Sequence, residues 1–277
     1  MATFAINDSL NWAVSKRRIC VLDADGGFQP IPGKMATVRE DNDQVLGIVS
    51  DDYEVLANSD LKQLIQPMVD EEVLTVTNTG FLNGGRKVFV QAQVAQDYEV
   101  AGFKHKGLIT LLNSHDGTTR VAVGPTAIRV ICGNTFSQSY AELGEKFRHG
   151  AGVTENFLSS KAVINFVNEA MQRYSEQVET LAAAPCSAGQ FQQVIEKVTG
   201  KEIKNVRDSV VSKLNDLFYN GRGNEGRTMA DAFNAWTDLN SNHSRKNATG
   251  SYFYANFGQG AKVNAKAMRV LTEMATV

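Results

Sequence analysis

Over residues 11–123 the apolar positions recur every second residue or in short runs, and this pattern predicts β-strands. The alternation is clearest in residues 88–94, where even-numbered positions are Val or Ala and odd-numbered ones include two glutamines. Turn-forming Gly, Asn and Asp residues separate the apolar segments. The expected strands are residues 11–22, 34–39, 45–50, 73–79, 86–94, 107–112 and 120–123, with turns at 23–27, 40–43, 83–85 and 114–117.

Helical spacing interrupts this pattern and then dominates the second half of the chain. Ser59 is the expected N-cap of a helix over residues 59–70. Pro125 suits a first helical turn, and the apolar spacing after it predicts a helix over residues 125–142. The β-branched residues of 128–131 leave a strand as the alternative there. Further helices are expected over residues 156–184, 188–199, 206–219, 228–239 and 261–274.

These elements predict an α+β fold. An antiparallel β-meander with flanking helices is expected to form a core domain over residues 1–145. A mostly helical region over residues 146–277 packs on that core or continues it. The change in composition near residues 144–152 marks the boundary.

The composition fits one large domain or two modest ones, since 43% of the 277 residues are hydrophobic. No run of about 18 apolar residues is present, so no membrane span is expected. Residues 1–10 lack the pattern of a signal peptide. The three cysteines are odd in number and far apart, which indicates a reducing cytoplasm and no disulfide framework or zinc knuckle. We therefore expect a cytoplasmic protein without a cofactor.

Charge is distributed unevenly, although the formal net charge is only −2. Residues 1–99 hold 8 Lys and Arg against 15 Asp and Glu, a net of −7, and residues 100–277 hold 20 against 15, a net of +5. The net charge argues against a strongly basic nucleic-acid binder but is compatible with a local basic surface. Ordinary surface variation explains the asymmetry equally well.

The polar turn after residue 112 holds the most conspicuous candidate site. His115 and Asp116 are adjacent, as in some metal sites, but the chain has only four histidines and none in an HxH or HExxH spacing. The alternatives are a hydrogen-bonded turn, for which Asp116 and Gly117 are suited, or the wall of a ligand groove. We expect no metal, and we place Asn113 with His115 and Asp116 among the candidate residues.

Arg129 stands in an apolar segment, and a buried guanidinium there needs an acceptor or an anion. One interpretation is a structural ion pair or a bond to the meander, and the other is a bidentate phosphate contact. Arg120 lies near the same turn and is a further candidate. Asn134 is a candidate for a bond to nearby backbone or to a base edge, with the structural role favoured.

Cations at the starts of two expected strands form a second candidate surface. Arg86 and Lys87 open one strand after a hairpin, and Lys104 and Lys106 precede another. In a meander these four cations can lie at one end of the sheet and follow a nucleic-acid backbone. Solvated loops carry the same residue types, so the structural alternative stays open.

The C-terminal region is the richest in cations, with seven Lys and Arg against four Asp and Glu over residues 218–277. Lys262, Lys266 and Arg269 are spaced by four and three residues and share one helix face. Basic residues with nearby aromatic ones hold unpaired strands by phosphate contact and base stacking. The other candidates in this region are Arg222, Arg227, Arg245, Lys246, Tyr252 and Tyr254.

Local catalytic motifs are not found in the chain. There is no nucleophile elbow, catalytic-triad order or paired-carboxylate motif, and the loop Gly221-Arg-Gly223 lacks the GK[ST] ending of a P-loop. A binding protein is therefore favoured over an enzyme. An active site divided along the chain would leave no such motif, so the distinction stays open.

A set of motifs in order along nearly the whole chain points to one family. They are Leu10-Asn-Trp-Ala-Val14, Val45-Leu-Gly-Ile-Val49 with Tyr53 and Asn58, Gly80-Phe-Leu-Asn-Gly-Gly-Arg86, Asn113-Ser-His-Asp-Gly117, Arg129-Val-Ile-Cys-Gly-Asn-Thr135, Asn234-Ala235 with Asp238 and His243, and Phe257-Gly-Gln-Gly-Ala261. Together they resemble the phage/plasmid-like proteins grouped as domain of unknown function 932. The Pro-Trp-His-Gly-like N-terminal segment of many members is missing. The resemblance implies origin from a mobile element and supplies no activity.

The predicted order of helix (59–70), meander (73–123) and helix (125–142) also resembles the core of Rad52-like single-strand annealing proteins. This analogy, the family and the basic second half favour a phage- or plasmid-encoded cytoplasmic homo-oligomer that binds single-stranded DNA and promotes annealing or recombination. One alternative is a nucleotide-binding protein or hydrolase built on the 113–120 turn. Another is a protein-only inhibitor of a host defence that acts through the acidic N-terminal half.

Overall fold

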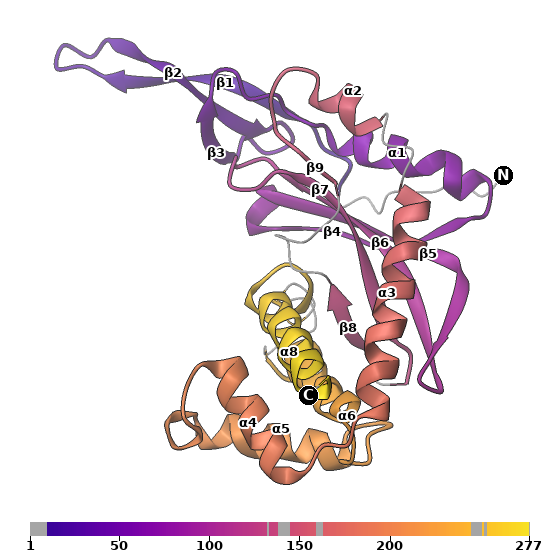
Figure 1. Ribbon diagram of the computed structural model, residues 1–277. Coiled ribbons are helices and arrows are strands. Elements are labelled where there is room, and N and C mark those ends of the chain that lie inside the picture. The colour runs from indigo at the N-terminus through magenta and orange to yellow at the C-terminus, as the bar shows by residue number, and fades with distance from the viewer. Residues whose placement is uncertain are drawn as a thin grey trace. The chain divides into compact units, whose positions relative to one another are not determined.

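A computed structural model of the protein describes residues 10–131, 133–137, 145–158, 163–244, 251 and 254–276. Helices and antiparallel sheets occur together in it, which confirms the predicted α+β class (Figure 1). The chain forms two compact units, neither of which is a single stretch of sequence. Unit 1 comprises Met1–Ala95, Ile109–Gly124 and Gly144–Ile164, and unit 2 comprises Gln96–Leu108, Pro125–Leu143 and Asn165–Val277.

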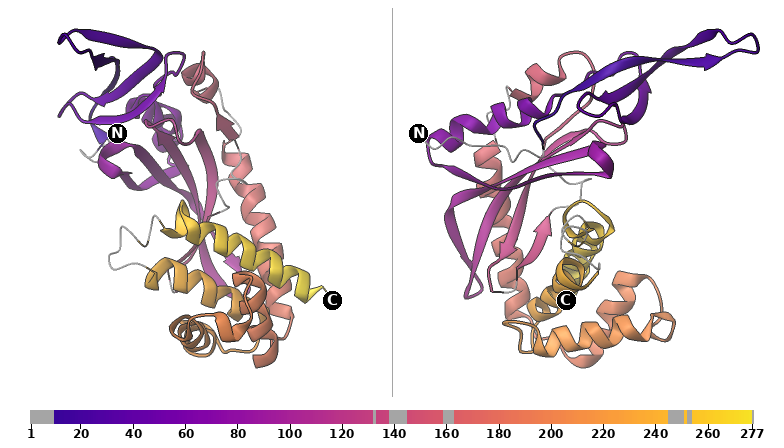
Figure 2. Two further views of the ribbon diagram at one scale, coloured as in Figure 1. Left: turned by 90° about the vertical axis from the view of Figure 1, so that its left-hand side faces the viewer. Right: turned by 180° about the vertical axis from the view of Figure 1, so that it is seen from behind.

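Unit 1 begins with a three-stranded antiparallel sheet in the order β1-β2-β3. The strands are β1 (Val14–Leu22), β2 (Phe28–Arg39) and β3 (Val45–Ser50). The bounds of β3 are those expected, whereas β2 starts earlier because Phe28 pairs with Leu22 across the tight turn at Asp23. Beyond the residues that pair with β3, β1 and β2 continue as a two-stranded hairpin that projects from the rest of unit 1 (Figures 1 and 2).

The first helix, α1 (Asn58–Asp70), confirms the helix expected over residues 59–70. Its N-cap is Ala57 and not Ser59, because the backbone is extended at Ala57 and its amide donates to Asp60 Oδ2 at 2.9 Å. The carboxylate in the first turn therefore satisfies an amide that the helix leaves without a partner. The helix buries Leu61, Leu64 and Ile65.

The second sheet follows the path β4-β5-β6-β7-β8, with β9 paired to β7. Its strands are β4 (Leu74–Leu82), β5 (Lys87–Val100), β6 (Phe103–Ser114), β7 (Val121–Arg129), β8 (Asn134–Ser137) and β9 (Glu145–Phe147). The turn η2 (Asn83–Gly85) lies at the expected hairpin between β4 and β5. The meander predicted over residues 73–123 is thereby confirmed.

The prediction of a helix over residues 125–142 is wrong for the part of this segment that the structure describes. β7 continues through Pro125 to Arg129 and then pairs with β8, while residues 138–144 lie outside the described residues. The strand considered as the alternative for 128–131 is present as far as Arg129. Among the described residues of 125–142, the second helix of the order that resembles a Rad52-like core is not present.

Strand pairing explains why the helical spacing of apolar residues after Pro125 gave a wrong prediction. β7 pairs with β9 over Val121–Val123 and with β8 over Thr126–Arg129, so Pro125 falls between the two paired segments. On the side of β7 that faces β8 and β9, a residue without an amide N–H therefore interrupts no paired segment. The β-branched residues on either side of Pro125 also suit a strand buried on both faces, and Thr126 is only 1% exposed.

Helices form most of the rest of the chain. The short α2 (Val153–Leu158) lies in unit 1, and α3 (Val163–Ala183) begins in unit 1 and continues in unit 2. The other helices of unit 2 are α4 (Ala188–Thr199), η3 (Ile203–Asn205), α5 (Asp208–Asn220), α6 (Met229–Asp238), η4 (Leu239–His243) and α8 (Gln259–Ala275). The single helix expected over residues 156–184 is recorded as α2 and α3, with residues 159–162 outside the described part. Gly200 ends α4 in the left-handed conformation expected of a C-terminal glycine, at φ 71°.

Each unit has its own apolar core. In unit 1 the fully buried side chains include Leu46, Leu56, Leu61, Ile65, Leu74, Ile109 and Leu111. In unit 2 the rings of Phe191 and Phe218 stack with their centroids 4.3 Å apart, and Phe233 is also buried. Among the described residues, no helix is long and apolar enough to cross a membrane.

Candidate functional site

The polar turn after β6 is a buried structural centre of unit 1. Asn113 is 0% exposed, and its Nδ2 donates to the carbonyl of Leu56 at 2.9 Å. The Tyr53 hydroxyl donates to the Ser114 carbonyl at 2.5 Å, and burial raises the pKa of Tyr53 above its usual value. These bonds hold the turn against the segment between β3 and α1, so they assign the turn a scaffolding role.

His115 is fixed as a neutral imidazole. Asn58 Nδ2 donates to the carbonyls of Leu10 (3.3 Å) and Trp12 (3.1 Å), so Asn58 Oδ1 is the acceptor in its 2.9 Å contact with His115 Nε2. The proton of His115 therefore sits on Nε2, and Nδ1 is a buried acceptor without a hydrogen-bond partner. Burial, with a smaller effect from nearby His149, lowers the pKa of His115 to about 3.

Asp116 closes the turn in the way expected of a turn residue. Its Oδ1 accepts from the Ser114 hydroxyl (2.6 Å), the Thr118 amide (3.0 Å) and the Thr118 hydroxyl (2.6 Å). Partial burial works to raise the pKa of Asp116, but these bonds outweigh it and hold the pKa below its usual value. In the part of the chain that the structure describes, no three His, Cys, Asp or Glu side chains are placed to bind one metal ion.

Two further contacts lock this turn to the three-stranded sheet. Thr37 on β2 is fully buried and donates its hydroxyl to the His115 carbonyl at 2.6 Å. A Cβ on Gly47 of β3 would lie 2.6 Å from Asp116 Cα, which is closer than real Cβ contacts come. Glycine is required here because the two backbones touch.

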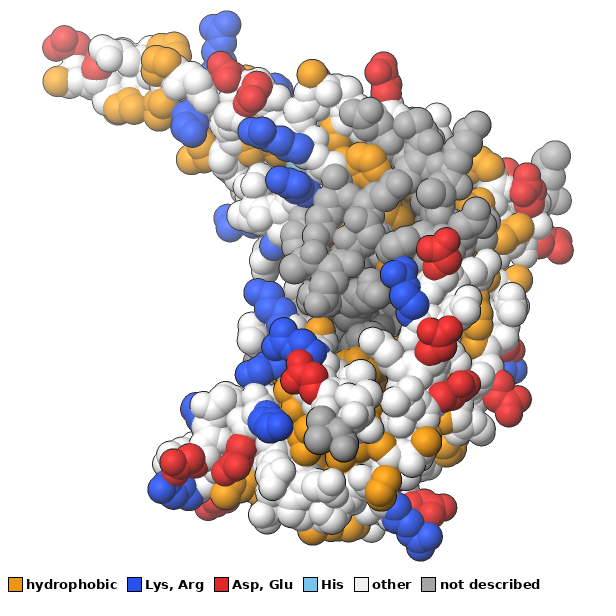
Figure 3. Space-filling model, in the orientation of Figure 1, with side chains coloured by type: hydrophobic (Ala, Val, Ile, Leu, Met, Phe, Trp, Pro, Cys, Tyr) orange, Lys and Arg blue, Asp and Glu red, His pale blue; other side chains and the backbone are white. Residues whose placement is uncertain are grey.

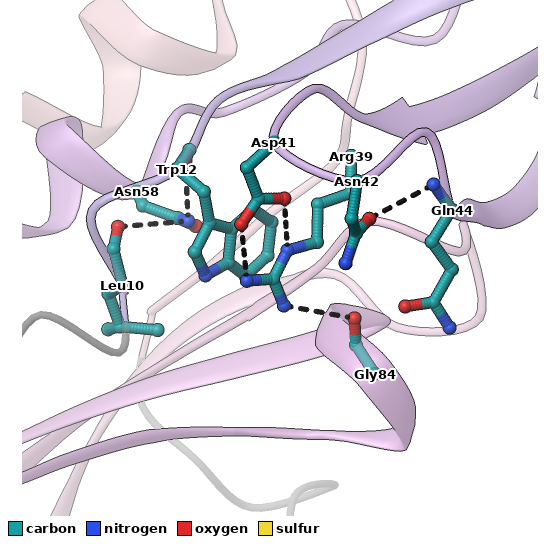
Figure 4. A network of polar contacts seen from close by, with 8 residues as sticks. All are labelled: Leu10, Trp12, Arg39, Asp41, Asn42, Gln44, Asn58 and Gly84. Carbon is teal, nitrogen blue, oxygen red and sulfur yellow. Dashed lines mark hydrogen bonds and ion pairs between the residues drawn. The ribbon is translucent and has the colours of Figure 1, made fainter.

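A second network in unit 1 centres on Arg39, which was not among the predicted site residues (Figure 4). Its Nε and Nη2 donate to the two carboxylate oxygens of Asp41 at 2.6 and 2.7 Å, and Nη1 donates to the Gly84 carbonyl at 3.3 Å. The guanidinium carbon lies 4.3 Å from the centroid of the Trp12 ring and 5.1 Å from that of Phe81. Only 12% of the Arg39 side chain is exposed, so this cation ties the turn after β2 to η2.

One feature of the sequence indicated residues of this network. Trp12 and Gly84 both lie in the motifs that resemble the family, although nothing local connects either of them to Arg39. A Cβ on Gly85 would lie 2.8 Å from Trp12 Cη2, so the glycines of η2 make room for the indole. Motif residues in unit 1 thus meet each other in the folded protein.

Arg129 has a comparable structural role in unit 2. It is 4% exposed, its guanidinium carbon lies 3.8 Å from the Phe103 ring centroid, and Nη2 donates to the Gly223 carbonyl at 3.0 Å. Nη1 donates to the Arg222 carbonyl (3.3 Å) and to Asn224 Oδ1 (3.2 Å). This geometry corresponds to the structural interpretation of Arg129, and it removes the residue from the surface that phosphate groups reach.

The glycine-rich loop before α6 is shaped around this arginine. Gly223 has φ 73°, and a Cβ there would lie 3.0 Å from Arg129 Nη2 and 2.9 Å from Phe103 Cε1. The same residues line a pocket of about 230 Å³ together with His105 and Asp231. His105 is 1% exposed, its Nε2 has no hydrogen-bond partner, and burial lowers its pKa. His105 Nδ1 donates to the Phe103 carbonyl at 2.9 Å, so Nε2 of the neutral ring is a buried acceptor.

The four cations expected at one end of the meander lie at opposite ends of β6. Lys104 and Lys106 lie near the start of β6. At the other end, just past the last residue of β6, the His115 amide donates to the Arg86 carbonyl. This correction follows from antiparallel pairing, because the start of one strand lies opposite the end of the next. Lys104 is also ion-paired with Asp97 at 2.5 Å.

Most other predicted cations are on the surface. Arg86, Arg120, Arg222 and Arg227 are exposed, while Lys87 and Lys106 are half-buried. Arg227 lies 3.6 Å from Glu225 in an exposed pair, which contributes little to stability. Arg245, Lys246 and Tyr252 lie outside the described residues, and of Asn134 only the backbone is described, as the first residue of β8.

The predicted basic face of α8 is present. Lys262 and Arg269 are exposed and Lys266 is half-buried, whereas the opposite face of the helix buries Ala261, Asn264, Ala267, Met268 and Leu271. Arg269 Nε is 4.0 Å from Glu273, at the limit of an ion pair. We call Lys262, Lys266 and Arg269 the α8 stripe. Among the predicted site residues that the structure describes, these three form a set on one continuous element.

A family model described as Domain of unknown function (DUF932) matches residues 45–269, and the chain belongs to this family. The match covers most of both units and includes the 113–118 turn, Arg129 and the α8 stripe. Among curated proteins and among solved structures, none matches the chain.

Proposed function

We propose that this member of the DUF932 family binds single-stranded nucleic acid through the α8 stripe of unit 2. The proposal includes annealing of complementary strands, origin from a phage or plasmid, and action in the cytoplasm of the host cell. The observation that carries it is the α8 stripe, where three cations follow one another along the solvent face of a helix. Neighbouring stripe positions are roughly 5–6 Å apart between Cβ atoms.

A stripe of this kind suits a flexible, unpaired backbone. Lysine ammonium groups contact phosphates as point charges without demanding a fixed geometry, and Lys262 and Lys266 have no ion-pair partner among the described residues. The opposite face of α8 is buried against the rest of unit 2, and this packing directs the stripe toward solvent, where a nucleic-acid strand can reach it. The buried Arg129 and His115 take no part.

An aromatic side chain lies against the first turn of α8. Tyr254 is half-buried, and a Cβ on Gly260 would lie 2.7 Å from its Cδ1, so its ring rests on the first turn of α8. Gly260 is one of the buried residues of α8, so this contact lies on the side of the helix away from Lys262, and the proposal rests on the three cations of the stripe.

The test is fluorescence anisotropy of a labelled single-stranded oligonucleotide titrated with the protein at two salt concentrations. Three phosphate contacts on a single strand contribute a slope of about −2 in a plot of log K against log salt, so a fourfold rise in salt weakens binding about twentyfold through them alone. The triple variant Lys262→Glu, Lys266→Glu, Arg269→Glu should lose this contribution, so its slope should be shallower by about 2 and its loss of affinity should be largest at the lower salt concentration.

A matched control carries the same change in charge elsewhere in unit 2. Lys197, Lys201 and Arg207 are exposed and lie on and after α4, so the variant with all three changed to Glu has the same net charge as the stripe variant. It should bind within about threefold of the wild type. Equal loss in both variants, or no binding of the wild type at low salt, would show that the stripe is not a nucleic-acid site.

A further inference from the structure

The projecting hairpin of unit 1 exposes more apolar surface than a two-stranded element can support in water. We call residues 19–33 the arm: the ends of β1 and β2 that extend beyond the pairing with β3, with the turn between them and Arg18 at the base. Phe28 is 76% exposed, Leu22 63% and Val21 55%. A two-stranded hairpin without a covered face is marginally stable in water, so the arm needs a partner surface.

Both faces of the arm are apolar. Leu22 pairs with Phe28 and Cys20 pairs with Pro30, which places these four side chains on one face. Val21, paired with Gln29, points to the other face. Because apolar side chains stand on both faces, packing one face onto unit 1 itself would still leave the other in solvent.

The two edges of the arm differ in what they can pair with. On the β2 side, Pro30 and Pro32 interrupt the row of amide donors, which closes that edge to another strand. On the other side β1 is the edge strand of the sheet order β1-β2-β3 and holds no proline. A new strand can therefore add only along β1.

Charge along the arm indicates which strand fits that edge. The turn at the tip carries Asp25, which is exposed, and the base carries Arg18, which is exposed as well. Neither side chain has an ion-pair partner among the described residues, whereas Arg17 is paired with Asp43 and Asp23 is used inside the turn. Figure 3 shows acidic side chains at the tip of this projection, apolar ones along it, and both basic and acidic ones at its base.

We propose that the arm is the contact surface for a second copy of this chain. Two arms lie antiparallel, β1 against β1, about a two-fold axis between Val21 and Leu22, midway between Arg18 and Asp25 in sequence. The acidic tip of each copy then lies beside the basic base of the other, and the apolar faces continue across the contact. The same patch serves both copies, as two-fold symmetry requires. This contact is independent of the proposed nucleic-acid site.

Cys20 makes the geometry testable in the wild-type chain. It is exposed near the middle of the arm, Cys186 is buried, and the third cysteine, Cys132, lies outside the described residues. A short bis-maleimide should convert the full-length protein to a covalent dimer, and Cys20→Ser should abolish that product. A dimer that forms equally in Cys20→Ser, or wild-type protein that stays monomeric in sedimentation at all concentrations, overturns the proposal.

A charge exchange tests the antiparallel arrangement itself. Asp25→Lys and Arg18→Glu should each weaken dimerisation by at least about tenfold in sedimentation equilibrium, because each places like charges together. The double variant restores opposite charges between copies and should return to within about threefold of the wild type. Additive losses in the double variant would exclude the tip-to-base arrangement.

The apolar contribution has its own control. Leu22→Ser with Phe28→Ser should abolish the dimer, whereas Ile48→Ser, which removes an equally exposed side chain (64%) outside the arm, should not. All these positions are on the surface, so the circular dichroism spectrum should not change. If Ile48→Ser breaks the dimer and the arm variants do not, the contact lies on β3, and the proposal is wrong.

Discussion

Acidification should destabilise unit 1, because the fold holds His115 in its neutral form. The imidazole is fully buried and its folded-state pKa is about 3, against about 6.5 in an unfolded chain. Between about pH 3 and pH 6.5, His115 is protonated in the unfolded chain and neutral in the folded chain. The free energy of unfolding therefore falls as pH falls below about 6.5, and above that pH this group contributes no pH dependence.

The size of the effect follows from the same two pKa values. At pH 5 the unfolded state binds nearly one proton that the folded state does not, and a difference of one bound proton is worth about 1.4 kcal/mol per pH unit. Moving from pH 7 to 5 should thus cost unit 1 about 2 kcal/mol through His115 alone. Burial also lowers the pKa of His149, which lies in the same unit and adds to the loss in the same direction.

Urea denaturation at pH 7 and pH 5 measures this loss. The chain has two tryptophans, and Trp236→Phe leaves Trp12, whose ring centroid is 5.5 Å from that of His115, as the fluorescent reporter of unit 1. In this background His115→Gln should lose about 2 kcal/mol less than its parent between the two pH values. The reasoning fails if both proteins lose the same amount, or if the NMR signal of the folded-state His115 ring titrates above pH 5.

Two substitutions test the close contacts of each unit. Gly47→Ala should lower the free energy of unfolding of unit 1 by about 1–3 kcal/mol, because the new Cβ would press on the Asp116 backbone; an unchanged urea midpoint by Trp12 fluorescence would contradict this. Arg129→Met should cost unit 2 roughly 2–4 kcal/mol, because three acceptors lose their donor, and Trp236 fluorescence should report it. Retention of the wild-type midpoint would show that those acceptors find water instead.

The parts of the fold that were predictable are those in which local signals agree with each other. For α4, Ser187 accepts from the Gln190 amide at its start and Gly200 adopts φ 71° at its end, so both bounds follow from neighbouring residues. Residues 125–129 show the opposite case. Their conformation depends on pairing with β8 and β9, and a spacing rule that considers one segment at a time cannot include those partners.

In the candidate site, too, the sequence predicted where polar residues lie but not what they do. The turn from Asn113 to Asp116 was identified correctly as a place where polar groups gather. What those groups do is decided by Thr37 and Asn58, which are 78 and 57 residues away from His115 in sequence. No spacing within the turn encodes these partners, so its structural role emerged only from the folded arrangement.

The distinction between buried and exposed polar residues separates stability from recognition in this protein. The most conspicuous polar residues, His115 and Arg129, use their hydrogen-bonding groups inside the units and are closed to solvent. Changing them should shift the unfolding midpoint and leave the salt dependence of nucleic-acid binding at its wild-type slope. The α8 stripe should behave in the opposite way, because its side chains carry charge into solvent and little of the core. A variant of Arg129 that keeps its fold but flattens the salt slope would break this separation and place phosphate contacts in the loop around Gly223.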